Sequence, residues 1–161
     1  MYILSRQQEN FLHELAKNKM EFVPMYETDV IFYPGRQTEF YDSGKEKVRL
    51  EELEGIRFIQ NYQDEFFDFG SVQEDAFQWR DLDISVLTNS DYIMEKMLKN
   101  SKVSNVSGSY LSENKKGTTP GIPLELGNNK VIFGYIFHKG EKMDDSVEEF
   151  LTFLNGRLPK S

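Results

Sequence analysis

The amino-acid sequence predicts an α+β fold, a single domain over 1–161 in which about three main helices pack on a mainly antiparallel sheet. Apolar residues recur at helical spacing near the N-terminus, in the centre and near the C-terminus. The segments between them are rich in β-branched and aromatic residues and are bounded by turn residues. These turns point to hairpins instead of a regular alternation of strand and helix, which favours antiparallel pairing.

The helices are placed by periodicity together with capping residues. The first is predicted at 6–19, the central one begins after Asn89 or Ser90, and the last runs from Asp145 to Gly156. Each has an apolar stripe that should face the sheet. The stripes are Phe11, Leu12, Leu15 and Ala16 in the first helix, Ile93, Met94, Met97 and Leu98 in the second, and Val147, Phe150, Leu151 and Leu154 in the third.

The strands are placed by β-rich runs between turn signals. Pro24 is expected to stop any continuation of the first helix, and the Pro34-Gly35 turn predicts that 28–33 pairs with 38–41. The turn-forming segment 127–129 predicts a hairpin between 124–126 and 130–137. One helical turn is expected within 48–54, and a short helix is expected to end near Trp79. Residues 158–161 are predicted to form a tail. The remaining predicted strands are 56–62, 83–87 and 103–111.

Composition excludes several classes of protein. The chain has no cysteine, so disulfides, thiolate nucleophiles and sulfur-ligated zinc sites are ruled out, and a reducing compartment such as the cytoplasm is expected. Its longest apolar run, 131–137, is far shorter than the ~20 residues of a membrane-spanning helix. The N-terminus lacks the long apolar run of a signal peptide. We expect no membrane association.

Negative charge is concentrated in one part of the chain. The formal net charge is −8, and residues 51–95 hold twelve acids against Arg57 and Arg80, a net of −10, which leaves +2 for the rest. A local negative field repels phosphate backbones and attracts basic surfaces, so direct nucleic-acid binding is not expected. Aromatic residues stand beside the acids in this region. The residues predicted to bind a partner are Glu65, Phe66, Phe67, Asp68, Glu74, Asp75 and Trp79.

Motifs for catalysis or cofactor binding are missing. Neither glycine-rich nucleotide-binding pattern occurs, and the two histidines, His13 and His138, lack metal-ligand spacing, so no cofactor is expected. Asp81 and Asp83 would project to one side of a strand, where they are candidate ligands of Mg²⁺ or Ca²⁺.

The favoured hypothesis is therefore a protein that neutralises or escorts a basic protein partner, as an immunity protein or antitoxin does. Two alternatives stay open. One is a small hydrolase that uses Asp81 and Asp83 on a divalent metal. The other is a homodimeric chaperone or regulator without catalysis, whose dimer surface is 131–137 or the central, methionine-containing helix.

Overall fold

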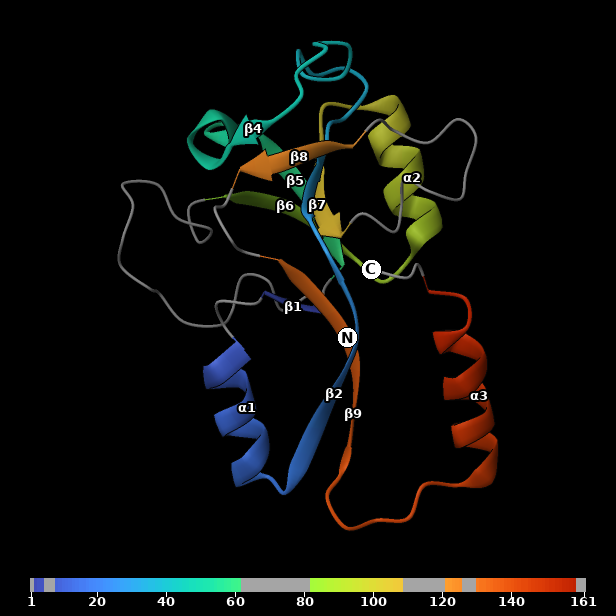
Figure 1. Ribbon diagram of the computed structural model, residues 1–161. Helices are drawn as coiled ribbons and strands as arrows, with labels where there is room; N and C mark the ends of the chain where they lie inside the picture. The colour runs from blue at the N-terminus through green and yellow to red at the C-terminus, as the bar shows by residue number, and fades with distance from the viewer. Residues whose placement is uncertain (1, 5–7, 62–81, 109–120, 126–129, 159–161) are drawn as a thin grey trace.

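The computed structural model describes residues 2–4, 8–61, 82–108, 121–125 and 130–158 (Figure 1). Within them lie three α-helices, which are α1 (Gln8–Lys17), α2 (Asp91–Asn100) and α3 (Asp145–Asn155), and the short 3-10 helix η2 (Leu50–Leu53). The strands are β1 (Tyr2–Leu4), β2 (Met20–Thr28), β3 (Val30–Tyr33), β4 (Val48–Arg49), β5 (Arg57–Asn61), β6 (Asp83–Thr88), β7 (Asn105–Gly108), β8 (Ile122–Glu125) and β9 (Val131–His138). The fold is α/β, and its sheets mix antiparallel and parallel pairs.

The strands form two lobes. The smaller lobe has the antiparallel order β1-β9-β2 and carries α1. The larger lobe has the order β4-β8-β3-β7, and a parallel bridge between Phe58 and Ser104 joins β7 to the parallel pair β5-β6. The chain passes between the lobes twice, from β2 to β3 through Asp29 and again from β8 to β9. The lower half of Figure 1 shows β2, β9 and α1, and the upper half shows the larger lobe with α2.

Each lobe has its own core. In the larger lobe the rings of Phe32, Phe40 and Phe58 meet edge to face on one side of the sheet. On the other side, Met94 and Leu98 of α2 pack with Ile59 and neighbouring residues. In the smaller lobe the apolar side of α1 covers β2 and β9. Burial of apolar surface on both sides of the larger sheet explains why β3, Val-Ile-Phe-Tyr, is apolar and buried throughout.

The predicted helices are confirmed in position, but their packing differs. Ser90 caps α2 by accepting from Ile93 N at 3.4 Å, as the sequence predicted. Leu12 of α1 and Ile93 of α2 were expected to pack inward, yet they are 40% and 48% exposed. The packing of α3 differs most from the prediction, because none of its residues is buried. No helix among the described residues combines the length and apolar character that a bilayer crossing requires.

The first strands differ from the prediction in two ways. The first helix ends at Lys17, before Pro24, as expected, but β2 was not predicted, and Pro24 lies within it where the register with β9 shifts between Pro24 and Tyr26. A strand tolerates proline at such an irregularity because the ladder needs no N–H there. The segment 38–41 is a turn and not a strand, since both the backbone N–H and the hydroxyl of Thr38 donate to the Gly35 carbonyl. The partners of β3 are instead β7 and β8.

The predicted hairpin between 124–126 and 130–137 is also wrong. Both strands exist, but β8 pairs with β3 and β4 in the larger lobe, while β9 pairs with β1 and β2 in the smaller one. The chain between them therefore crosses from one lobe to the other instead of folding back. The short helix predicted near Trp79 lies outside the described residues.

Candidate ligand-binding site

The carboxyl ends of β5, β6 and β7 meet at one edge of the larger sheet. Ile59 N donates to Ser104 O and Ser104 N donates to Arg57 O, both at 2.8 Å, so β5 and the start of β7 run parallel. After β5 the chain continues to β6 on one side, whereas after β7 it continues to β8, beyond β3 on the other side. Ligands bind α/β sheets at such a reversal of strand order, outside the carboxyl ends of the strands.

Two buried side-chain amides lie between β5 and β7, just past the last backbone hydrogen bond that joins them. Asn105 is fully buried and Gln60 is 1% exposed. Asn105 Nδ2 donates to Ile59 O at 2.9 Å and also to Gln60 Oε1, while Gln60 Nε2 donates to Val106 O at 3.2 Å. These side chains therefore link β5 and β7 by hydrogen bonds where the two backbones no longer bond to each other directly.

Asn105 Oδ1 takes no part in this hydrogen-bond network. It is buried and has no hydrogen-bond partner among the described residues, the only side-chain atom of that part of the chain in this state. An unsatisfied buried amide oxygen costs about 1–3 kcal/mol, so native structures rarely keep one without a reason. The atom is an acceptor, and the group that would satisfy it must donate an N–H or O–H.

The start of α2 lies at the same edge. Thr88 ends β6 in register with Asn61, the last residue of β5. The Thr88 hydroxyl accepts from Ser90 N at 3.1 Å, and Ser90 then caps the helix. The free backbone N–H groups of a helix N-terminus carry a partial positive charge that favours acceptor or anionic groups. The start of α2 therefore supplies donors at this edge, and the buried acceptor of Asn105 lies at the first residue of β7, beside Ile59 and two residues before the end of β5.

In the described part of the chain, the ionisable groups with shifted pKa values lie elsewhere, on the surface. Hydrogen bonds from Lys45 and from the backbone of Arg49 lower the pKa of Glu52 to about 2. The hydrogen bond to Asp29 raises the pKa of Lys130, at the point where the chain passes between lobes. Lys17 lowers the pKa of Glu14, and Ser146 lowers that of Asp144. These shifts come from surface ion pairs and a helix cap, and none indicates an acid or base poised for catalysis.

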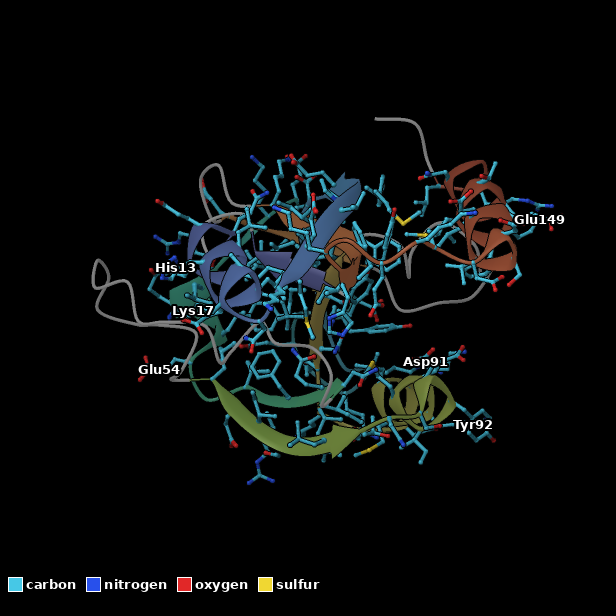
Figure 2. The ribbon with its side chains drawn as sticks, turned by 90° about the horizontal axis from the view of Figure 1, so that it is seen from below. His13, Lys17, Glu54, Asp91, Tyr92 and Glu149 are labelled. Atoms are coloured by element: carbon cyan, nitrogen blue, oxygen red, sulfur yellow. The ribbon has the colours of Figure 1, made fainter. Side chains whose placement is uncertain are left out.

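The sequence-predicted partner-binding residues, Glu65 to Trp79, all lie outside the described residues, and so does Asp81. Asp83 is described: it is exposed at the start of β6, 3.9 Å from Arg57 Nε, and it accepts from the Ser85 hydroxyl at 2.9 Å. No group of three or more metal-binding side chains occurs in the described part of the chain. His13 and His138 are exposed and belong to the smaller lobe, His13 on the outer side of α1 (Figure 2).

Sequence reasoning missed Gln60 and Asn105. Neutral amides belong to no catalytic or metal-binding motif, so a search for such motifs passes over them. The available signal was their setting: Gln60 follows Arg-Phe-Ile in a predicted strand, and Asn105 lies two residues after Val103 and directly before Val106. Apolar neighbours of this kind indicate a buried strand, and a buried amide must then find partners within the protein.

Comparison with known proteins identifies the fold. No family model matches the chain, and no curated protein does. Among solved structures, full-length CbnR in complex with its target DNA is 12% identical, with a TM-score of 0.60, over 91% of this chain and 53% of CbnR. The reduced form of OxyR is 13% identical, with a TM-score of 0.56, over 94% of this chain and 77% of that one.

A third similar structure is the C-terminal domain of a probable LysR family transcriptional regulator from Rhodococcus sp. RHA1. It is 11% identical, with a TM-score of 0.54, over 91% of this chain and 80% of that one. The chain thus spans about half the length of CbnR and most of the shorter structures. Its fold resembles part of a LysR effector-binding domain.

Proposed function

We propose that this chain is a binding domain without catalytic activity, which takes a small polar molecule at the carboxyl ends of β5 and β6 and the start of β7. Two observations support the proposal: the likeness of the fold to LysR effector-binding domains, and the reversal of strand order between β5 and β7. The observation that carries it is the buried acceptor Asn105 Oδ1, which has no partner among the described residues. A ligand with an N–H or O–H donor would satisfy it.

The test is a ligand screen followed by a substitution at Asn105. Thermal unfolding is measured with each of the twenty amino acids, a set of monosaccharides and a set of small carboxylic acids. A ligand present at a hundred times its Kd stabilises the folded state by about 2.7 kcal/mol, which raises the Tm by roughly 5–10 °C in a domain of this size. A compound with that effect is then titrated by calorimetry.

For a compound that binds, Asn105→Ala is expected to weaken affinity at least about tenfold, since one hydrogen bond to a buried group is worth roughly 1.5 kcal/mol. Thr28→Val is the matched control, because Thr28 is also a buried polar residue but belongs to the smaller lobe. Both variants should fold, although each loses stability. Equal affinity of Asn105→Ala and the parent chain would remove this edge from the proposal.

A second candidate function rests on the charge of −10 in residues 51–95. An acidic region of this size suits a basic protein partner, which complementary charge would bring in quickly and hold with a strong dependence on salt. We propose this partner binding for the region around Glu65 to Trp79. It is compatible with a ligand-binding edge on the same chain, because a regulatory domain can do both.

Charge reversal tests this second function. A partner retained from lysate of the native host at low salt and released at high salt is identified by mass spectrometry and then purified. Reversal of Glu65, Asp68, Glu74 and Asp75 is expected to weaken its binding at least about tenfold and to flatten the salt dependence. The control reverses four exposed acids outside the region, which are Glu9, Glu21, Glu39 and Glu141. If both variants bind alike, the acidic region does not form the contact.

A further inference from the structure

The apolar side of α3 is largely exposed. Phe150 and Phe153 are each 58% exposed and Val147 is 43% exposed, while Leu151 and Leu154 are half-buried. The helix has eleven residues, and none of them is buried. Isolated helices of this length are marginal in water, and most helices gain their stability from packing of an apolar side. A persistent α3 therefore requires a surface that covers these side chains.

Such a surface exists on the smaller lobe. Side chains alternate along β9, and Ile132 and Ile136 turn toward α1, so Phe133, Tyr135 and Phe137 turn to the opposite face. These three residues are half-buried, and the rings of Tyr135 and Phe137 lie 6.1 Å apart. Val23 of β2 stands opposite Tyr135 in the register. We call Val23, Phe133, Tyr135 and Phe137 the outer face. In both figures the sheet lies between α1 and α3, so α3 is on the side of the outer face.

The connection between β9 and α3 is short and is held by hydrogen bonds at both ends. Lys139 N donates to Lys19 O at 2.8 Å, Glu141 N donates to His138 O at 3.2 Å, and Gly140 has a φ of +87°. At the other end, Asp144 caps α3 by accepting from Ser146 N at 2.9 Å. Between these two fixed points Glu141 and Lys142 are exposed. A short, exposed connection of this kind allows a helix to leave its own lobe and pack on another copy.

We propose that two copies of the chain exchange α3, so that the apolar side of each helix packs on the outer face of the other copy. Both surfaces are present on every copy, and a two-fold arrangement satisfies them reciprocally. Charge favours this contact over pairing of the two helices. Acids gather at the start of α3, where Asp144, Asp145, Glu148 and Glu149 would repel their equivalents in a parallel helix pair, whereas Lys19 and Lys139 lie where β2 begins and β9 ends.

The oligomeric state gives the first test. Light scattering of the full chain from about 5 to 200 μM should detect a dimer, and Phe150→Glu combined with Phe153→Glu should weaken it at least tenfold. Both positions are exposed in the single chain, so the substitutions should not prevent folding. The control is Thr152→Glu, which adds charge to the same helix away from its apolar side. A monomeric parent chain, or a dimer unaffected by the phenylalanine substitutions, would overturn the proposal.

Cross-linking separates exchange from closure of α3 on its own lobe. The chain has no cysteine, so a chain with Tyr135→Cys and Leu151→Cys has one thiol on the outer face and one on α3. Exchange predicts a covalent dimer after oxidation, while each single-cysteine chain stays unlinked. A disulfide within one chain would show that α3 packs on its own outer face, and the absence of any disulfide would show that α3 does not reach either face. Both results contradict the proposal.

Discussion

Replacing Phe58 with alanine is expected to lower the free energy of unfolding by about 3–5 kcal/mol. Phe58 is completely buried, and its ring meets that of Phe32 with centroids 6.3 Å apart. Its backbone also lies between two neighbours, because it pairs with Ile84 of β6 and forms the bridge to Ser104. The substitution leaves a cavity where β5 holds the parallel strands together, and the surrounding backbone can collapse into it only in part.

Urea unfolding measures this loss as a lower midpoint with an unchanged slope. Leu87→Ala is the matched control, since Leu87 is a large apolar residue of the adjacent strand β6 but is 63% exposed. Its substitution should change stability by no more than about 0.5 kcal/mol. Similar losses in the two variants would show that Phe58 is not at the centre of the larger core.

Replacing Gly134 with alanine should destabilise the smaller lobe by about 1–3 kcal/mol or more. A Cβ at this position would lie 2.3 Å from the carbonyl oxygen of Val23 and 2.5 Å from the ring of Phe22. Neither neighbour moves freely, because the carbonyl belongs to the backbone of β2 and Phe22 packs against Phe11 of α1 at a centroid distance of 5.4 Å. β2 or α1 must therefore shift.

Thermal unfolding of Gly134→Ala and Gly156→Ala compares the two cases. The nearest atom to a Cβ on Gly156 is 3.5 Å away, and that residue has an ordinary helical backbone, so its variant should keep the parent Tm within about 2 °C. Gly134→Ala should unfold several degrees earlier. Equal Tm values would mean that β2 and β9 are farther apart than the structure has them.

The sequence predicts the elements of this fold better than their pairing. Helical spacing located α1, α2 and α3, and the β-rich runs located β3, β5, β6, β7, β8 and β9. Pairing is set by tertiary contacts that periodicity does not encode, so the hairpin expected between β8 and β9 was instead a passage between lobes. β2 was not predicted because it contains Pro24, and whether a strand accepts a proline depends on its register with a neighbouring strand.

Burial of the helices was predictable only in part. The same kind of apolar stripe is buried in α1, where Phe11 and Leu15 meet Phe22, and unburied in α3, where Phe150 and Phe153 face solvent. The stripe indicates that a helix packs on another surface, but it does not indicate which surface.

The site could not be predicted from the sequence for a similar reason. The pairing that brings Gln60 to Asn105 joins residues 45 apart in the chain and leaves no local pattern.

The most direct test of ligand binding at the β5–β7 edge follows the backbone amides of the ¹⁵N-labelled protein by NMR during titration with a compound that raises the Tm. Binding at this edge predicts that the largest shift changes fall on Asn61, Thr88, Ser90 and Asn105, at the carboxyl ends of β5 and β6 and at the starts of α2 and β7. If the signals of these four amides stay unchanged and those of other amides shift, while the compound still stabilises the protein, binding at this edge is contradicted.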